Sequence, residues 1–236
     1  MDKKEAKVFF ENPVVVEEKV DGANLGISIT DDYKLKFQNR YVHQHMYVSF
    51  SNNWLIDLTL SPARQQVSLD PASILDLNVN HHYYYLVQWK GLEDWAKNHP
   101  GIWSILTNPE IVIFGEWMMA KHSIHYTHLP DYFLAFDIYE KNTGKFLSHA
   151  EKSRRFEEAG LAQVPVLRQG VTTREELLAL LESKSSFRDG VVEGVYVRID
   201  DAQYLVQRGK VVRSDFIATP DAHWTKAQFT KNVIRY

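Results

Sequence analysis

Three short strand-like segments with turn residues between them, the first of which begins with the apolar run Val14-Val15-Val16, constrain the fold of this chain more than any other feature. They occupy residues 14–18, 25–30 and 33–38. Asp21-Gly22 lies between the first two, and Asp31-Asp32 lies between the last two. Short runs of this kind, bounded by Asp and Gly turns, are typical of β-strands joined by tight turns. We therefore expect the chain to begin with strands of an antiparallel sheet.

Strand and helix signals do not alternate regularly along the rest of the chain. Further strands are predicted over residues 111–118, 132–139, 191–199 and 203–213, and the last two form a hairpin around Asp200-Asp201. A regular βαβ alternation would indicate a parallel sheet, and it is absent here. The pattern therefore predicts an α+β fold with mainly antiparallel sheets.

Helices are predicted over residues 92–98, 148–159, 172–181 and 221–236. Two of these helices have a capping-box signature at their start, Ser148 with Glu151 and Thr172 with Glu175. Residues 50–80 are rich in Ser, Asn and Pro, and we expect them to be irregular.

Composition limits the possible classes of protein. The length of 236 residues suits one large domain, and 44% hydrophobic with 24% charged residues is ordinary for a globular protein with a substantial core. Cysteine is absent, which excludes a disulfide framework, a thiolate zinc site and a cysteine nucleophile.

Charge and hydropathy give expectations about partners and location. The formal net charge of -3 provides no basic field over the whole protein, so any groups that bind a polyanion must be local. The N-terminus lacks an apolar signal segment, and no apolar run reaches membrane length. We therefore expect an intracellular protein, cytoplasmic or nuclear, with no membrane partner.

One lysine stands between the first apolar run and the Asp-Gly turn, in the segment Glu-Lys-Val-Asp-Gly-Ala-Asn at 18–24. Glycine at this position allows a sharp turn and a close approach of the backbone to a ligand. The arrangement would hold the Lys19 amine still above a nucleotide phosphate. The alternative is a solvated lysine beside a hairpin turn, because four-residue patterns recur by chance.

Further segments follow Lys19 in a fixed order. They are Gln-Asn-Arg at 38–40, Phe-Gly-Glu-Trp at 114–117, Phe-Leu-Ala-Phe-Asp-Ile-Tyr at 133–139, Glu-Gly-Val-Tyr-Val-Arg at 193–198, and Gln-Arg-Gly-Lys-Val-Val-Arg at 207–213. Together they resemble the covalent nucleotidyltransferase superfamily, most closely the ATP-dependent RNA ligases of the nick-sealing type. The resemblance runs from about residue 13 to the C-terminus. It implies a nucleotidyltransferase domain with antiparallel sheets around a nucleotide-binding groove.

The resemblance also implies a reaction. Lys19 attacks the α-phosphorus of ATP and forms lysyl-AMP, with Mg²⁺ or Mn²⁺ as the metal. AMP then passes to an RNA 5′-phosphate, and an RNA 3′-hydroxyl attacks that activated end to form the phosphodiester. The implied cofactors are therefore ATP, carried as covalent AMP, and the divalent metal, and the implied partner is RNA with 3′-hydroxyl and 5′-phosphate ends.

Arg208 and Lys210 lie two residues apart on one predicted strand, so both side chains point to one face. A solvated strand face is the structural alternative. In similar ligases this pair faces the lysine and the ATP phosphates, and it favours the neutral amine that a lysine nucleophile requires. Arg213 has the opposite parity and is a weaker candidate.

Other site residues follow from the resemblance alone. Glu193 binds the metal, and Glu116 binds the ribose hydroxyls. Phe136 stacks on adenine, with Phe133 as second choice, although either ring could simply belong to the core. The backbone of Glu18 reaches the adenine amino group. Asn24 and Arg40 complete the nucleotide-binding set.

Asn24 separates the members of the superfamily. DNA ligases and mRNA capping enzymes usually carry arginine five places after the lysine, whereas nick-sealing RNA ligases carry asparagine, so Asn24 favours an RNA ligase. The segment after Arg213 is too short for the OB-fold that usually follows in those rivals. We expect a single domain over residues 1–236, with 214–236 as a short tail packed on it.

Three alternatives stay open on the sequence. The chain could be a DNA ligase, a capping-type nucleotidyltransferase or a catalytically idle RNA-binding module of the same fold. An unidentified protein partner could help to bind the nucleic acid, and a monomer is assumed.

His122, His125 and His128 recur every three residues, which on a helix would favour a zinc site. A loop beside the groove is the favoured interpretation, because similar ligases have a comparable Lys-His-Ser-Ile segment.

Overall fold

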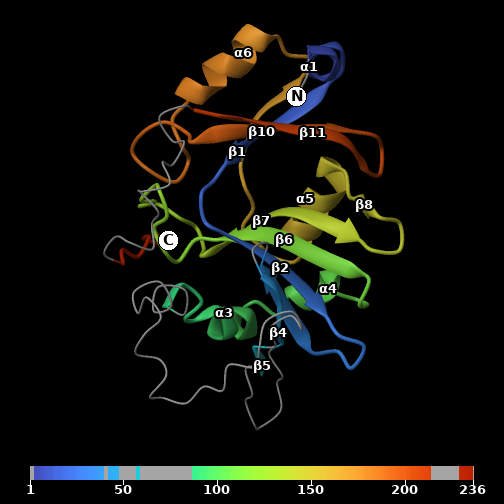
Figure 1. Cartoon of the computed structure of the whole chain (residues 1–236), viewed down its shortest axis with the longest axis vertical. Coiled ribbons are helices and arrows are strands. Elements are labelled where there is room, and N and C mark those ends of the chain that lie inside the picture. Colours follow the sequence, from blue (N-terminus) through green and yellow to red (C-terminus); the bar gives the residue numbers. More distant parts are fainter. Residues whose placement is uncertain (1–2, 40–41, 48–56, 59–86, 214–228, 236) are drawn as a thin grey trace.

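The computed structural model describes residues 3–39, 42–47, 57–58, 87–213 and 229–235 (Figure 1). Its strands form two antiparallel sheets, one in the order β11-β10-β1-β9 and one in the order β5-β4-β3-β2-β6-β7-β8. The strands are β1 Val14–Lys19, β2 Ala23–Ile29, β3 Leu35–Asn39, β4 Val42–Tyr47, β5 Asp57–Leu58, β6 Ile111–Trp117, β7 Phe133–Glu140, β8 Lys145–Phe146, β9 Val166–Gly170, β10 Gly194–Asp200 and β11 Leu205–Val212. The helices are α1 Lys3–Glu11, α3 Leu92–Asn98, α4 Ile102–Ile105, α5 His149–Glu158, α6 Arg174–Ala179 and the 3-10 turn Leu180–Glu182.

The smaller, four-stranded sheet is covered by helices on one face. Alternate residues of β1 and β10, such as Val16 and Val197, are buried against Phe9 of α1 and Leu177 of α6. Figure 1 shows α1 and α6 on one side of this sheet and the larger sheet on the other. Because side chains alternate along a strand, the opposite face of β1 carries Glu17 and Lys19 toward the larger sheet.

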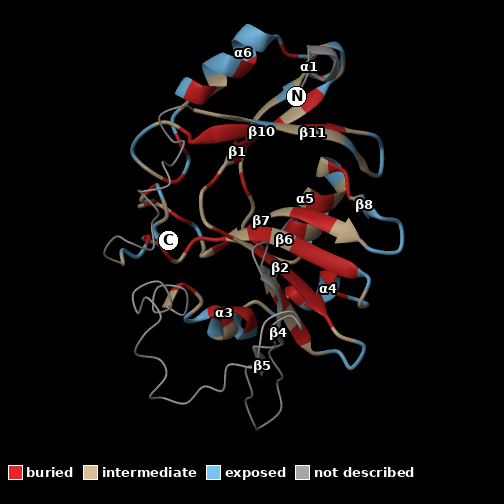
Figure 2. Ribbon diagram, viewed as in Figure 1, coloured by how far each residue is buried: buried red, intermediate tan, exposed pale blue. Residues whose placement is uncertain are grey.

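The larger sheet has its own core. Apolar residues of β2, β6 and β7, such as Ile27, Ile113 and Phe133, pack with Trp95 of α3 and Phe156 of α5. Figure 2 shows buried residues along β2, β6 and β7, as it does along β1 and β10 of the smaller sheet. The other face of this sheet points toward the smaller sheet, so the two sheets present their non-helical faces to each other.

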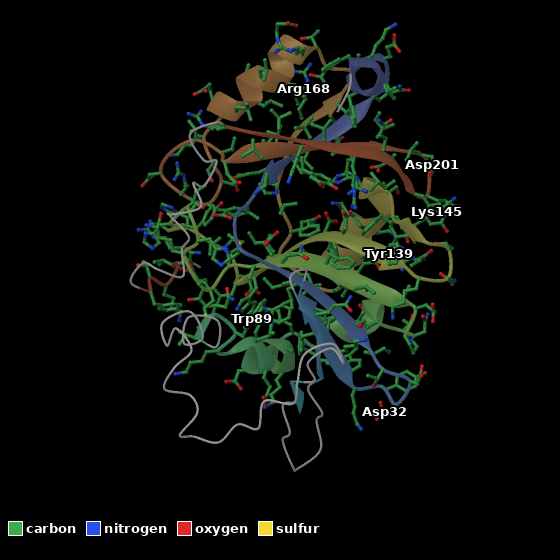
Figure 3. The ribbon with its side chains drawn as sticks, viewed as in Figure 1. Asp32, Trp89, Tyr139, Lys145, Arg168 and Asp201 are labelled. Atoms are coloured by element: carbon green, nitrogen blue, oxygen red, sulfur yellow. The ribbon has the colours of Figure 1, made fainter. Side chains whose placement is uncertain are left out.

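Several contacts join the two sheets. β1 and β2 belong to different sheets, so the chain crosses between them in residues 20–22, immediately after Lys19. At the other end of the sheets, Leu147 forms a β-bridge with Tyr204, and Lys145 Nζ lies 4.8 Å from the Tyr204 ring centroid. Figure 3 shows Lys145 and Asp201 on this same side of the molecule.

The predicted α+β fold with antiparallel sheets is confirmed. The helix predicted over residues 92–98 is α3, and Ser148 Oγ accepts a hydrogen bond from Glu151 N at the start of α5. The predicted cap at Thr172 is wrong by one residue, because Thr173 forms the capping box with Glu176. Residues 50–80 lie outside the described residues except for β5.

The predicted C-terminal helix is wrong over the described residues 229–235. These residues form no helix and bridge to an earlier loop, with Lys231 paired to Ala120 and Ile234 to Leu129. The rest of the predicted helix lies outside the described residues. Among the helices in the described parts, none combines the length and apolar character needed to span a membrane.

Candidate active site

Lys19 ends β1, and its Nζ donates a hydrogen bond to Glu193 Oε1 at 2.5 Å. Glu193 stands immediately before β10, where Gly194 pairs directly with Lys19. A Cβ on Gly194 would lie 2.4 Å from the Val211 carbonyl oxygen, so this position accepts only glycine while β11 stays in place. The Lys19 side chain is 25% exposed and that of Glu193 only 8% exposed, which places the pair at the edge of solvent.

The second carboxylate oxygen of Glu193 is buried and has no hydrogen-bond partner among the described residues. Burial raises the pKa of Glu193, and the attraction of Lys19 and Lys210 opposes that rise. A buried polar atom without a partner is costly and marks a place where a ligand can bind.

This oxygen fits a magnesium or manganese ligand. Magnesium is usually held by one or two carboxylates and completes its shell with phosphate oxygens and water. Within the described residues, no group of three or more His, Asp or Glu side chains could hold a metal by itself. A metal at Glu193 would therefore depend on the nucleotide for further ligands.

The basic pair on β11 shares the face of Lys19. Strand register places Lys210 opposite Tyr196 and Arg208 opposite Arg198, and directly opposite residues point to the same side. Tyr196 lies in turn opposite Glu17, two residues before Lys19. This agrees with the parity predicted for Arg208 and Lys210.

Arg208 and Arg213 have defined partners. Arg208 Nη1 lies 3.6 Å from Asp137 Oδ2, and its guanidinium carbon lies 4.3 Å from the Phe146 ring centroid. Arg213 Nη1 donates to Glu182 Oε1 at 2.8 Å, beside α6. That contact lies on the other side of the smaller sheet, so Arg213 points away from Lys19.

The turn after Lys19 is fixed by the protein itself. Asp21 N donates to the Tyr126 hydroxyl at 2.9 Å, and Asp21 Oδ2 accepts from Ser123 N at 2.7 Å. Gly22 does not have a left-handed φ. A Cβ on Gly22 would lie 2.6 Å from Met118 Sδ and 2.9 Å from the Trp117 carbonyl oxygen. Glycine is therefore required here by the close approach of β6, whereas the sequence suggested a close approach to a ligand.

The larger sheet contributes Asn24 and Glu116, which lie directly opposite each other on β2 and β6. The pairing of β6 with β7 then shifts by one residue, because Phe114 opposes Asp137 while Gly115 opposes Ala135. The shift leaves Phe136 without a partner in the ladder. A bulge of this kind re-aims side chains, and Asp137 here reaches Arg198 of the smaller sheet.

The two phenylalanines of β7 have different environments. Phe133 is fully buried, and its ring centroid lies 5.0 Å from that of Trp95. Phe136 is half-buried and packs beside the cluster that contains Val20 and Met118, next to the Lys19 turn. Phe133 thus belongs to the core of the larger sheet, while part of Phe136 stays accessible.

Glu18 points away from Lys19. Its Oε1 accepts from Ser185 Oγ at 2.6 Å and its Oε2 from Ser186 N at 3.0 Å, and burial raises its pKa. Glu18 N donates to the Pro165 carbonyl at 2.9 Å. The Glu18 amide nitrogen is thus engaged within the protein.

A network of buried charges beside the site was missed from the sequence. Lys152 Nζ donates to Glu17 Oε1 at 2.7 Å and to the Phe136 carbonyl oxygen. Arg198 Nη1 donates to Asp137 Oδ1 at 2.8 Å, and Arg198 Nε donates to Asp200. These contacts connect α5, β1, β7 and β10. An arginine within the apolar run at 193–198 was the one sequence signal of this network.

Arg40, the remaining predicted nucleotide-binding residue, lies outside the described residues. The three histidines have separate partners: His122 Nε2 lies 3.2 Å from Gln88 Oε1, His125 Nε2 lies 3.1 Å from the Lys231 carbonyl oxygen, and His128 Nδ1 lies 2.8 Å from Thr127 Oγ1. They occupy an irregular loop beside the Lys19 turn. This agrees with the loop interpretation and gives no support to a zinc site.

The two facing antiparallel sheets form a fold of the nucleotidyltransferase type. A family model described as RNA ligase matches residues 12–212, and the chain therefore belongs to the RNA ligase family. No curated protein sequence matches the chain.

Solved structures of a Naegleria gruberi RNA ligase have a similar fold. The ligase with pyrophosphate has a TM-score of 0.54 at 17% identity, over 91% of this chain and 54% of that chain. A mutant of that ligase with ATP and Mn has a TM-score of 0.52 at 13% identity, over 90% of this chain and 52% of that chain. The chain spans about half the length of these solved ligases.

Proposed function

We propose that this protein is an ATP-dependent RNA ligase that joins RNA 3′-hydroxyl and 5′-phosphate ends through lysyl-AMP and RNA-adenylate intermediates. The observation that carries the proposal is the 2.5 Å contact of Lys19 Nζ with Glu193, in a chain of the RNA ligase family. Lys19 ends a strand and precedes a restrained turn, so its amine is already oriented before a nucleotide arrives.

In the first step, the amine of Lys19 attacks the α-phosphorus of ATP. The nitrogen–phosphorus bond forms, the bond from phosphorus to the β-bridging oxygen breaks, and pyrophosphate leaves. A lysine is nucleophilic only when neutral, so the Lys19 ammonium that pairs with Glu193 in the resting enzyme must first release a proton to solvent. The nitrogen releases a second proton as the nitrogen–phosphorus bond forms.

Phosphate charge is offset by cationic groups on the same sheet face. Arg208 and Lys210 lie on the face of Lys19, and we assign them to the ATP phosphates. Mg²⁺ or Mn²⁺, when bound, would be held through the buried oxygen Oε2 of Glu193 and would polarise the phosphates. The solved Naegleria ligase with ATP and Mn supports this choice of nucleotide and metal.

The nucleoside is assigned to the larger sheet. Glu116 would accept hydrogen bonds from the ribose hydroxyls, and Phe136 would stack on the adenine ring. The Glu18 carbonyl would accept from the adenine amino group. Asn24, opposite Glu116, and Arg40 complete the proposed set.

The two later steps use the same centre. AMP passes from Lys19 to the 5′-phosphate of RNA, which restores the lysine. The RNA 3′-hydroxyl then attacks that 5′-phosphate, the phosphodiester forms, and AMP leaves.

Labelling with radioactive ATP tests the proposal directly. Protein incubated with α-labelled ATP and magnesium should retain AMP on a denaturing gel, through a bond that acid cleaves and base does not. Lys19→Ala should abolish the label, while the matched control Lys7→Ala on α1 should label like wild type. Label that persists in Lys19→Ala would refute the nucleophile.

Parallel reactions separate the related activities. Labelling by GTP in place of ATP would indicate a capping-type enzyme, and sealing of nicked DNA in preference to RNA would indicate a DNA ligase. Absence of any label with either nucleotide would favour an idle RNA-binding module.

A further inference from the structure

The described C-terminal residues 229–235 lie against the loop of residues 119–129. Asn232 is the centre of this contact and is buried. Its Nδ2 donates to the carbonyl oxygens of Met118 at 2.7 Å and Ala120 at 3.2 Å, and its Oδ1 accepts from Tyr126 N at 2.9 Å. Both amide hydrogens and the amide oxygen of Asn232 therefore have partners. All three partners are backbone groups, and they belong to Met118, which precedes this loop, and to Ala120 and Tyr126 within it.

The loop carries this restraint to the turn that follows Lys19. The Tyr126 hydroxyl accepts from Asp21 N at 2.9 Å, and Ser123 N donates to Asp21 Oδ2 at 2.7 Å. Burial raises the pKa of Tyr126 well above its ordinary value, so the hydroxyl stays protonated. The turn is thus held at both the backbone and the side chain of Asp21, two residues beyond Lys19.

We propose that Tyr126 and Asn232 are positioning residues for Lys19. In this arrangement the C-terminal segment, acting through the Asn232 side chain and the Tyr126 hydroxyl, sets the direction in which the turn presents the lysine amine. The inference rests on the proposed function, because the direction of Lys19 matters to the rate only if Lys19 is the nucleophile.

A positioning role differs from a purely structural one in what it changes. The Tyr126 ring packs among Val20, Met118, Ile124 and Leu129, so deleting the ring would disturb the core. Deleting only the hydroxyl keeps that packing and removes the contact with Asp21. A displaced amine attacks phosphorus more slowly, while the groups assigned to nucleotide binding stay in place.

Tyr126→Phe is therefore the decisive variant. We expect the single-turnover rate of AMP transfer at saturating ATP to fall about three- to tenfold, the effect of one ordinary hydrogen bond. The dissociation constant for ATP should stay within about twofold of the wild-type value. Tyr204→Phe is the matched control, because the Tyr204 hydroxyl lies 3.3 Å from Glu140 Oε2 at the other end of the sheets, away from the turn that follows Lys19.

Two kinetic outcomes would overturn the proposal. One is a wild-type rate in Tyr126→Phe. The other is equal slowing in Tyr126→Phe and Tyr204→Phe, which would show a general effect of hydroxyl loss.

Hydrogen exchange at the Asp21 amide tests the same link without activity. We expect this amide to exchange about three- to tenfold faster in Tyr126→Phe and in Asn232→Ala than in wild type. Unchanged exchange in Tyr126→Phe would overturn the proposal even if Asn232→Ala failed to fold. Failure of the wild-type protein to label with AMP would instead refute the proposed function and leave the exchange result standing.

Discussion

Glu17 lies in β1, and Glu193 immediately precedes the neighbouring strand β10. Both side chains are buried carboxylates, but the charged groups around them differ. Burial alone would raise the pKa of Glu17, but Lys152 at 2.7 Å, His149 at 3.1 Å and Arg198 outweigh it and lower the pKa to about 2. Glu193 has one close cation, Lys19, and burial raises its pKa.

The difference separates a structural carboxylate from a ligand-binding one. Glu17 lies in a network whose members come from four elements, so its charge is compensated within the protein. Glu193 keeps a buried oxygen without a partner among the described residues, and a perturbed, incompletely paired group is typical of a functional site. Changes to the network should therefore affect stability, and changes at Glu193 should affect chemistry.

The largest expected effect is on stability, from Arg198→Met. Arg198 is fully buried and donates to Asp137, Asp200 and the Leu147 carbonyl oxygen. Removing it leaves buried carboxylates without compensation, and we expect a loss of about 3–5 kcal/mol in the free energy of unfolding. Urea denaturation measures this loss.

Arg154→Met is the matched control for that variant. Arg154 pairs with Glu151 and Glu158, but its side chain is 53% exposed. Exposed ion pairs contribute little to stability because solvent screens them, so this variant should unfold almost like wild type. A loss below about 1 kcal/mol for Arg198→Met would contradict the structural role of the network.

The pH dependence of stability should show the contribution of Glu17. Its pKa is about 2 in the folded protein against an ordinary value of 4.5, so its stabilisation is present above pH 4.5 and is lost as the pH falls toward 2. That difference corresponds to about 3 kcal/mol. Unfolding free energies measured from pH 6 to pH 2 should fall less steeply in Glu17→Gln than in wild type, and parallel curves would contradict the prediction.

The face of the smaller sheet that carries Lys19, Arg208 and Lys210 could be predicted because strand periodicity is local. The spacing of Arg208 and Lys210 placed both on one face, and their register with β10 agrees. Arg213 has the opposite parity, and its side chain contacts Glu182 on the other side of the smaller sheet. The roles of Arg208 and Lys210 in catalysis stay predictions.

The larger sheet and the C-terminal segment depend on contacts that the local pattern does not contain. The shift in pairing between β6 and β7 directs Asp137 toward Arg198, 61 residues further along the chain. Asn232 binds the Tyr126 backbone 106 residues away, and the described residues around it form bridges to a loop in place of the helix that we expected. Tertiary contacts of this kind override local propensity.

Glu193→Gln should affect chemistry far more than folding. The substitution keeps size and hydrogen bonding but removes the charge that selects a hard cation. We expect the adenylylation rate to fall about a hundredfold, or about 2.7 kcal/mol, with partial recovery at high magnesium. Because burial raises the pKa of Glu193, its protonated form stabilises the fold, and this stabilisation is lost as the pH rises through the raised pKa. Gln is uncharged, like the protonated form. Glu193→Gln should therefore not destabilise the protein at neutral pH.

Glu116→Gln is the contrasting variant, because it keeps the same shape on the other sheet. If Glu116 holds the ribose, its defect should be weaker ATP binding with little dependence on magnesium. Adenylylation rates across a magnesium titration measure both variants together. A wild-type rate for Glu193→Gln at low magnesium would show that the metal ligand is a different acid.

The smallest expected effect comes from the two phenylalanines of β7. Phe136→Leu keeps most of the volume but removes the aromatic face, so ATP binding should weaken by about 1–3 kcal/mol, as for other base–aromatic stacks. Phe133→Leu is the matched control: its ring is fully buried beside Trp95, so this variant should lower the melting temperature and leave ATP affinity unchanged. Calorimetric titration of ATP and thermal unfolding of both variants separate these effects. If Phe133→Leu weakens ATP binding while Phe136→Leu does not, then Phe133 is the stacking ring, and the bulge in β7 positions Asp137 alone.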